Sequence, residues 1–411
     1  MNVTGQQILR AFFAPCAASW CVVTAACSNG SAAPPPHVDE VPPAESLVSA
    51  PSTPQLRVPP GYDIVKIASL RGPRVILPRD DGSLFVTQTG DDLLALVADR
   101  DGDGQYEVTT LRRNLDSPHG MALHGGFLYI ANTGAVVRSV LDSAGLPTGA
   151  LETVARYSHG GGHFTRSIVF GDDGGMYVSI GSSCNLCIET SPDRAAVMRF
   201  DADGRNGRVF ARGLRNAVGM AVHPVTRAIW VSQHERDNLK PDHENLPPEE
   251  INILQDGGDY GWPYCHSDRV PNPEYNDQAR CDRTIPPALK MQAHSAPLGM
   301  TFLATATQLP KDWRGDLLLS FHGSWNRDTP TGAKVVRIRV QNNRPVSYED
   351  FVVGWQRANG SRWGRPADVA VAHDGSVLIA DDFGDAIWRL SRVSGGDRRE
   401  GRTGRPEQQP R

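Results

Sequence analysis

The chain has 411 residues and a nearly balanced charge, with 42 Lys and Arg residues against 46 Asp and Glu residues and a formal net charge of −4. This balance excludes a nucleic-acid binder, which would carry a strong basic surplus. A mean hydropathy of −0.36, with no long apolar run after the N-terminus, excludes a polytopic membrane protein. The 41 glycines and 31 prolines, together with short apolar runs, favour an all-β body with many turns.

Residues 1–27 have the pattern of an export signal. They hold one charged side chain, Arg10, an apolar stretch over Ile8–Ala26, and small residues before Cys27. The Thr-Ala-Ala-Cys ending resembles a bacterial lipoprotein box, in which the cysteine carries the lipid; an ordinary cleaved signal is the alternative. We expect an exported protein that is either periplasmic or anchored to a membrane through Cys27.

Two segments flank the folded body. Residues 28–58 are rich in Pro, Ser and Ala, and residues 394–411 are rich in Gly, Arg, Gln and Pro. Such compositions lack the apolar side chains needed for a core. We therefore expect a disordered linker, a folded domain over residues 59–393 and a disordered tail.

One unit repeats along this domain: a turn with Gly or Asp, an alternating apolar strand, and a second strand that closes a hairpin. Most copies lie roughly 43 to 53 residues apart, within the period of propeller blades. Sustained helical periodicity is missing after the signal, so helix is expected to be minor. The pattern predicts a six-bladed β-propeller, whose loops at one mouth of the channel carry the chemistry; a β-sandwich fits so many regular hairpins poorly. The copies start at Gly82, Gly126, Gly175, Arg227, Gly315 and Gly375.

Four cysteines follow the signal, and an even number in an exported protein favours pairing. Cys265 and Cys281 flank a loop without core residues, which predicts a disulfide that closes this loop. Cys184 and Cys187 have CxxC spacing. We favour a local disulfide there over a redox site or half of a zinc site.

Several loops carry candidate functional residues. His163 follows three glycines and precedes a strand, a place that suits a general base, although a lone histidine is more often structural. Arg215 and Asn216 precede the fourth strand, where a guanidinium suits carboxylates or oxyanions and an ordinary ion pair is the alternative. The polar segment 233–238 suits Ca²⁺ or a solvated loop equally. Residues 99–104 imitate the start of an EF-hand, but a turn is favoured.

Longer strings identify a family resemblance. Their order along the chain resembles the glucose/sorbosone dehydrogenase family, whose members are six-bladed propellers that use pyrroloquinoline quinone (PQQ) and Ca²⁺. The resemblance covers roughly Val58 to Val393 and is closest to the sorbosone dehydrogenase branch. The strings are GGMYVSIGSSCN at Gly174–Asn185, GLRN at Gly213–Asn216, GGDYGWP at Gly257–Pro263 and FHGSWN at Phe321–Asn326.

The resemblance implies roles for individual residues. His163 matches the catalytic base, which takes a proton from a sugar hydroxyl or hydrated aldehyde while hydride passes to PQQ. Arg215, counted as catalytic and cofactor-binding, and Asn216 match a pair that contacts the cofactor. Backbone carbonyls near His234 and Glu235 fall where the family holds Ca²⁺.

The remaining cofactor contacts include departures from the family pattern. Arg365 matches an arginine that binds a cofactor carboxylate, and a second arginine is replaced by Ala367. His119 stands where soluble glucose dehydrogenases have Gln, and His322 stands where they have a cofactor-binding Lys. Both histidines are shared with the sorbosone-like branch and are expected to bind the cofactor.

Two functions from different classes remain open. The first is an exported PQQ- and Ca²⁺-dependent dehydrogenase, an oxidoreductase acting on CH–OH or aldehyde groups of a sugar or sugar aldehyde. Its electrons would pass to a separate cytochrome or quinone, since the chain has no CxxCH haem motif. The second is a non-redox propeller that binds carbohydrate or a protein partner. A lactonase-type hydrolase is a weaker third option, with Glu250, Asn252 and Asp382 as its only candidate calcium cage.

Convergence of the candidate side chains is the feature that separates these functions. Four of them at one pocket would favour the dehydrogenase, whereas dispersal around the rim would favour a binding propeller. These four residues are His119, His163, Arg215 and Arg365.

Overall fold

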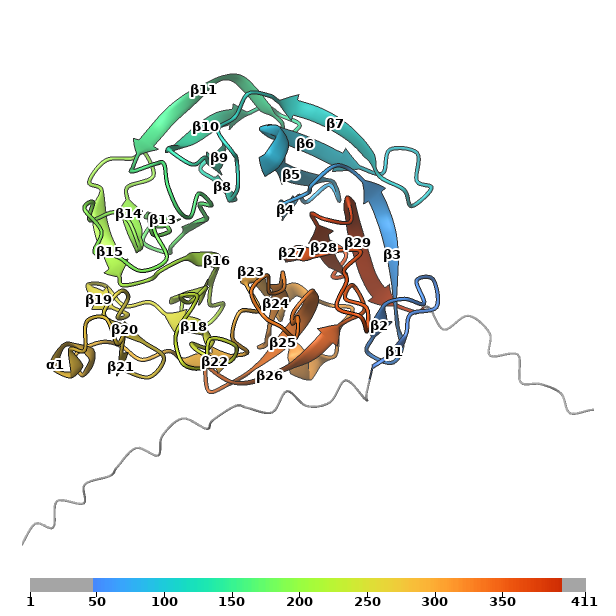
Figure 1. Ribbon diagram of the computed structural model, residues 1–411. Coiled ribbons are helices and arrows are strands. Elements are labelled where there is room, and N and C mark those ends of the chain that lie inside the picture. The colour runs from blue at the N-terminus through green and yellow to red at the C-terminus, as the bar shows by residue number, and fades with distance from the viewer. Residues whose placement is uncertain (1–46, 394–411) are drawn as a thin grey trace, which may run out of the picture. The chain divides into compact units, whose positions relative to one another are not determined.

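The computed structural model describes residues 47–393, which form a ring of six β-sheets around a central channel (Figure 1). The predicted six-bladed β-propeller is confirmed. The predicted signal, most of the predicted linker and the predicted tail lie outside the described residues. Helix is limited, among the described residues, to α1 (Gln278–Cys281) and short 3₁₀ turns, and none of the described helices is long and apolar enough to span a membrane.

The first three blades are antiparallel sheets whose strands run outward from the channel in chain order. Blade 1 contains β4 (Val75–Pro78), β5 (Leu84–Gln88), β6 (Leu93–Ala98) and β7 (Glu107–Arg112). Blade 2 contains β8 (Met121–His124), β9 (Phe127–Ala131), β10 (Ala135–Leu141) and β11 (Pro147–Arg156). Blade 3 contains β12 (Ile168–Phe170), β13 (Met176–Ile180), β14 (Ala196–Phe200) and β15 (Arg208–Arg212), with β19 (Gly258–Asp259) added in parallel to β15.

The last three blades repeat this arrangement. Blade 4 contains β16 (Ala217–Val222), β17 (Ile229–Gln233), β18 (Glu249–Ile253) and β22 (Leu289–Met291). Blade 5 contains β23 (Pro297–Phe302), β24 (Leu317–Phe321), β25 (Lys334–Gln341) and β26 (Arg344–Val352). Blade 6 contains β27 (Pro366–Val371), β28 (Val377–Asp381), β29 (Ala386–Arg392) and β3 (Tyr62–Ser69).

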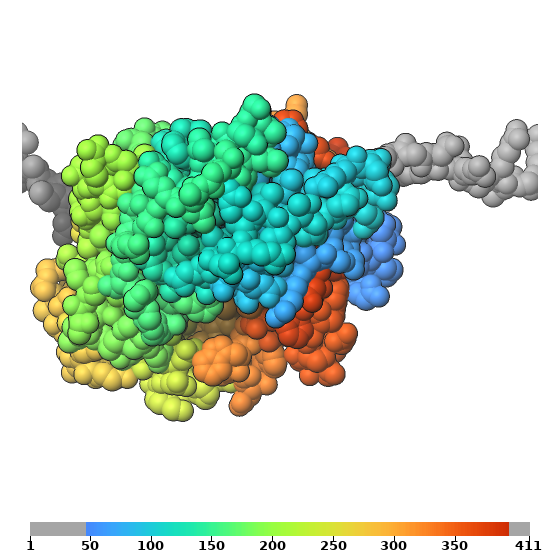
Figure 2. Space-filling view, turned by 90° about the horizontal axis from the view of Figure 1, so that it is seen from above, coloured from blue at the N-terminus to red at the C-terminus, as the bar shows by residue number. Residues whose placement is uncertain are grey.

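The strand β3 closes the ring, because it comes from the start of the domain and pairs with β29 from its end. The register places Ser69 opposite Ala386 and Tyr62 opposite Arg392. In the space-filling view the red C-terminal blade lies directly beside the blue N-terminal segment (Figure 2). Closure removes the exposed sheet edges that an open stack of blades would have.

The repeated strands found in the sequence are the second strand of each blade, from β5 to β28. Nearly all of their residues are buried because each strand faces a neighbouring blade on both sides, and β13, β17 and β24 are buried over their whole length. Apolar clusters fill the spaces between blades; one joins Trp230 and Ile251 to Leu317 and Phe321.

The predicted linker is wrong for residues 47–58. This segment forms a hairpin of β1 (Val48–Ser49) and β2 (Arg57–Val58), and Leu56 and Val58 are fully buried against Phe351 of blade 5. The prolines and serines around them obscured the apolar anchors, although a buried leucine is worth about 2 kcal/mol.

Both predicted disulfides are present. Cys184 pairs with Cys187 in the loop after β13, and Cys265 pairs with Cys281. The second disulfide closes an insertion between β18 and β22 of blade 4 that holds β20 (Cys265–His266), β21 (Val270–Pro271) and α1. Residues 99–104 form the exposed turn between β6 and β7, where Asp99 accepts hydrogen bonds from the N–H groups of Gly102 and Gly104.

Candidate active site

The residues predicted for the dehydrogenase site all lie in loops at one mouth of the channel. In an antiparallel blade, the loop that enters the first strand and the loop that leaves the second strand emerge at the same end. The loops that enter β8, β12, β16 and β27 carry His119, His163, the pair Arg215 and Asn216, and Arg365. The loops that leave β17 and β24 carry the pair His234 and Glu235, and His322.

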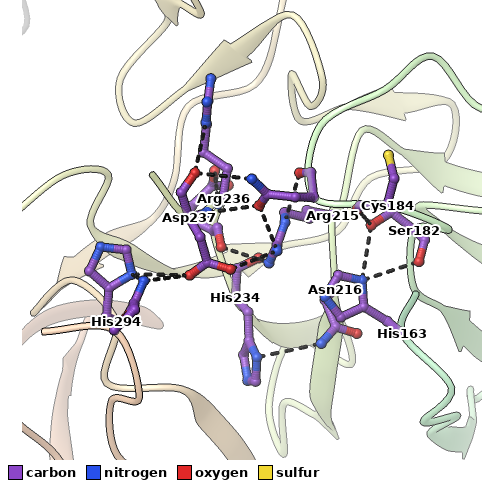
Figure 3. Close-up of polar contacts among 12 residues, drawn as sticks. His163, Ser182, Cys184, Arg215, Asn216, His234, Arg236, Asp237 and His294 are labelled. Carbon is purple, nitrogen blue, oxygen red and sulfur yellow. Dashed lines mark hydrogen bonds and ion pairs between the residues drawn. The ribbon is translucent and has the colours of Figure 1, made fainter. Parts of the chain in front are cut away.

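His163 presents a neutral imidazole with one free nitrogen. Its Nδ1 lies 3.1 Å from the carbonyl oxygen of Ser182 and 3.0 Å from Ser182 Oγ (Figure 3). A carbonyl oxygen can only accept, so Nδ1 carries the proton and Nε2 keeps its lone pair. Burial, followed by the positive charge of Arg215, lowers the pKa of His163 to about 4. The imidazole is therefore a neutral proton acceptor over a wide pH range.

Arg215 is buried and held on every side. It donates to the carbonyl oxygens of Glu235 at 2.7 Å and His234 at 3.4 Å, and to the backbone and side-chain oxygens of Asn185 at 3.1 and 2.9 Å. Asp237 completes this shell with an ion pair at 3.4 Å. Burial lowers the pKa of Arg215 from its usual value, while the charge of Asp237 opposes this change.

Asn216 and His234 lie beside these two residues. His234 donates from Nε2 to the carbonyl oxygen of Pro297 at 2.7 Å, so its Nδ1 accepts from Asn216 Nδ2 at 3.4 Å. The Asn216 Oδ1 atom is buried and has no hydrogen-bond partner among the described residues. Such an atom is costly unless a ligand supplies a donor.

A second network spans the other side of the mouth and centres on Asp382. This carboxylate binds His322 Nε2 at 2.8 Å and forms an ion pair with Arg74 at 2.6 Å. Arg74 also donates to His119 Nε2 at 3.3 Å, and Arg365 donates to the carbonyl oxygen of His322 at 2.9 Å. The network thus joins His119, His322 and Arg365, three predicted cofactor contacts from three blades.

Both histidines of this second network are neutral. Burial first, and then the charge of Arg74, lowers the pKa of His119 to about 3. Burial also lowers the pKa of His322 to about 4, although its hydrogen bond to Asp382 opposes this change. Burial first, and then neighbouring groups that include Arg215 and Arg74, lowers the pKa of His234 to about 3, so residues of both networks act on this imidazole.

Several residues of these networks were missed by the sequence reasoning. Arg74 precedes β4, the position that carries His119 in the next blade, and this equivalence could have identified it. Ser182 and Asn185 belong to the GSSCN string, but only the structure shows that their oxygens face His163 and Arg215. Asp237 was included in a polar loop without a role of its own.

Buried carboxylates lie behind the site in blade 4. Glu235 accepts from Gln233, Glu249 accepts from the N–H of Glu235 at 2.8 Å, and Glu250 accepts from Asn252 at 3.0 Å. Burial raises the pKa of Glu249 to about 7 and the pKa of Glu235 and Glu250 above the usual range.

The lactonase-type cage does not form. Glu250 and Asn252 lie on β18, two strands outward from the channel, whereas Asp382 is committed to His322 and Arg74 at the mouth. Ala367, predicted in place of a second arginine, packs against apolar side chains of the channel wall. That position therefore supplies no charge.

The residues at the mouth fit an anionic quinone such as PQQ. Among the described residues, no hydrogen bond reaches Nη2 of Arg74 or Nη1 of Arg365, so both guanidinium groups retain N–H donors for carboxylates. The unpartnered Asn216 Oδ1 adds a buried polar atom on the other side. At the predicted calcium position, Arg215 donates to the carbonyl oxygens of His234 and Glu235.

Comparison with known proteins identifies relatives of the whole propeller. A family model described as TrAA12-like matches residues 56–392. An uncharacterized protein of Borreliella burgdorferi is 28% identical over 82% of this chain and 91% of its own length. A PQQ-dependent pyranose dehydrogenase of Coprinopsis cinerea is 25% identical over 86% of this chain, and the match spans only 57% of that longer protein.

A solved structure supports the fold. The Trichoderma reesei enzyme of carbohydrate-active enzyme family AA12 superposes with a TM-score of 0.72 at 21% identity, covering 84% of this chain and 99% of that one. At this identity the likeness concerns the arrangement of the blades.

Proposed function

The chain belongs to the TrAA12-like family, and on that premise we propose that it is an oxidoreductase that uses PQQ to oxidise a sugar or sugar aldehyde. The observation that carries the proposal is the neutral His163, with its free Nε2, beside the buried cation Arg215. The naming of the Coprinopsis cinerea relative as a PQQ-dependent pyranose dehydrogenase supports the same substrate class.

In this proposal His163 acts as the general base. Its Nε2 takes the proton of a substrate hydroxyl while the carbon that bears the hydroxyl loses a hydride and becomes a carbonyl. PQQ, when bound, supplies the quinone that accepts this hydride. Because the pKa of His163 is about 4, the proton passes on to solvent after each turnover.

The arginines bind and orient in this scheme. Arg74 and Arg365 hold cofactor carboxylates with their free N–H groups, and Arg215 places positive charge where an oxyanion develops. His119 and His322 are fixed by Arg74 and Asp382 as neutral hydrogen-bonding groups at the rim. The chain's own residues therefore provide the base, the anion clamps and a buried cation.

Export and a separate electron acceptor complete the proposal. Two disulfides support an oxidising compartment, either the periplasm or a membrane surface reached through Cys27. The electrons would leave to a cytochrome or quinone that is not part of this chain.

Titration of chelator-treated protein with PQQ, with and without Ca²⁺, tests this function. We expect stoichiometric binding, reduction of an artificial dye with at least one aldose or aldehyde, and a loss of roughly 10²–10⁴-fold in the rate for His163→Gln. Dependence on Ca²⁺ in the same titration decides whether calcium takes part. Binding of carbohydrate without PQQ binding at micromolar concentration would instead identify a non-redox propeller.

A further inference from the structure

We propose that the loop Ser182–Cys187, closed by the Cys184–Cys187 disulfide, is a positioning element that fixes the proton-accepting tautomer of His163 and the orientation of Arg215. The contacts of the loop stand on the structure alone, whereas the catalytic meaning of the two residues rests on the proposed function.

Ser182 connects the loop to His163. Its carbonyl oxygen accepts from the backbone N–H of His163 at 2.9 Å and from Nδ1 at 3.1 Å. Its hydroxyl donates to the carbonyl oxygen of Cys184 at 2.7 Å, so the same hydroxyl can only accept from Nδ1 at 3.0 Å. Both contacts therefore demand a proton on Nδ1 and leave Nε2 bare. The direction of the Ser182 hydroxyl depends in turn on where the Cys184 carbonyl points.

Asn185 connects the same loop to Arg215, and all of its side-chain polar atoms are engaged. Its Oδ1 accepts from Arg215 Nη2 at 2.9 Å and from the N–H of Asp237 at 2.8 Å, while its Nδ2 donates to the carbonyl oxygen of Asp237 at 3.0 Å. Its backbone oxygen accepts from Arg215 Nε at 3.1 Å and from the indole N–H of Trp262 at 3.2 Å. Asn185 thus holds two edges of the guanidinium and the loop that carries Asp237.

The disulfide holds Ser182 and Asn185, the two anchors of the loop, in place. Cys184 and Cys187 are three positions apart, so their disulfide closes a small ring that contains Asn185. The first residue of this ring, Cys184, supplies the carbonyl oxygen that accepts from the Ser182 hydroxyl. No strand covers residues 181–195, and Ser183 contacts Cys187 Sγ at 3.8 Å and the carboxylate of Glu189, which follows in the same connection. On the other side, Gly162 packs so closely on the backbone of Ser182 and Ser183 that a Cβ there would collide. The loop therefore lies between the base and the arginine with little freedom to adjust.

The test measures the tautomer of His163 directly. Two-bond ¹H–¹⁵N spectra of the PQQ-free protein, with the His163 signals assigned by their loss in His163→Gln, distinguish a proton on Nδ1 from one on Nε2. We expect a single Nδ1–H form in the natural protein and a mixture in the double variant Cys184→Ser/Cys187→Ser. In parallel, PQQ affinity falls by roughly tenfold or more in the double variant, as when a residue that orients a binding group is lost.

The second disulfide provides the matched control, since the loop between Cys265 and Cys281 makes no hydrogen bond to His163, Ser182 or Arg215. We expect Cys265→Ser/Cys281→Ser to lower thermal stability but to keep the Nδ1–H form and the PQQ affinity. Ser182→Ala and Asn185→Ala test the two anchors separately if the first double variant does not fold. We expect Ser182→Ala to perturb the tautomer, with recovery in Ser182→Thr, and Asn185→Ala to weaken PQQ binding.

A folded Cys184→Ser/Cys187→Ser protein with an unchanged tautomer and unchanged PQQ affinity would overturn the inference, and so would equal effects from both double variants. These outcomes are separable from failure of the proposed function. If the natural protein binds no PQQ while its tautomer still responds to the Cys184–Cys187 loop, the function is wrong and the positioning role stands.

Discussion

The imidazoles at the channel mouth are neutral because of two effects, burial and the positive charge of nearby arginines. Burial lowers the pKa of His163, His234, His119 and His322, and nearby arginines lower it further in all four, although Asp382 opposes this change at His322. A site that gathers cations for an anionic cofactor therefore also keeps its histidines unprotonated. In the proposed function the arginines would thus bind the cofactor and, through their positive charge, keep His163 in its neutral, basic form.

The pH dependence of the reaction follows from this effect on His163. With a pKa of about 4, the base form predominates above that pH, so we expect kcat/KM to rise with pH through about 4 and to stay level through 6.5. Stopped-flow reduction of a dye across this range measures the profile. In His163→Gln we expect the decrease of kcat/KM at acidic pH to disappear. An acid limb near 6.5 would show that the imidazole is solvated, in conflict with the buried position seen here.

Asp382 carries the second network and gives a stability prediction. Asp382→Asn removes a partly buried charge that Arg74 and His322 share, and we expect a loss of about 2–4 kcal/mol in the free energy of unfolding, measured with urea. Asp172→Asn is the matched control, because its ion pair with Arg227 is solvent-exposed and we expect little change. Equal effects of the two variants would show that the Asp382 network adds nothing beyond a surface pair.

At the scale of elements, local signals predicted the strands well and their distant partners poorly. A turn followed by alternation marks each second strand, and an apolar third strand is recognisable downstream of five of them, so five of the blade hairpins could be found. The sequence of the closing strand β3 does not indicate which strand it pairs with. Its partner β29 lies at the other end of the domain, and nothing in residues 62–69 specifies that pairing.

For the site, too, residues in local strings could be predicted and contacts between distant residues could not. His163, Arg215 and Arg365 could be predicted because each lies in a recognisable string, and the structure places them at one mouth. His322 was predicted as a cofactor contact, but its contact with Asp382 and Arg74 could not be, since the three residues come from different blades and meet only when the ring closes. The anchors Ser182 and Asn185 depend on side-chain directions within an irregular loop.

The closing strand should be as important as an interior one. Ile64 of β3 is fully buried in the cluster between blades 5 and 6, and Ile64→Ala is expected to cost about 2–5 kcal/mol in the free energy of unfolding. Lys66→Ala on the same strand exposes no core and controls for the change in strand propensity. Chemical denaturation of both variants measures the difference. A cost for Ile64→Ala no larger than for Lys66→Ala would mean that β3 frays from the ring in solution.

At the scale of the whole molecule, closure also depends on a buried acid at the seam between the last blade and the first. Asp368 on β27 accepts from the backbone N–H of Ile76 on β4 at 2.9 Å, so one carboxyl group links blade 6 to blade 1 beside the channel. Burial raises its pKa to about 7, although the two backbone N–H groups and the charge of Arg74 oppose this change. The seam is therefore joined by a carboxyl group that is neutral in mildly acidic solution and ionised in mildly basic solution.

This raised pKa makes the stability of the ring depend on pH with a definite sign. The folded protein binds the Asp368 proton more tightly than the unfolded chain does, so this stabilisation is complete below pH 3.8 and is lost as the pH rises to 7. Asp368→Asn keeps a neutral side chain at every pH. Relative to the natural protein we expect it to gain up to about 4 kcal/mol between pH 4 and pH 8, at about 1.4 kcal/mol for each pKa unit. The buried histidines act in the opposite direction, but they are common to both proteins and cancel in the difference.

Urea unfolding of the two proteins at both pH values measures this gain, with the exposed Asp101→Asn as control. If the free energy of unfolding of the two proteins changed in parallel with pH, the ionised carboxylate would be in contact with water. The junction of blades 6 and 1 would then be stabilised by apolar contacts and backbone hydrogen bonds alone.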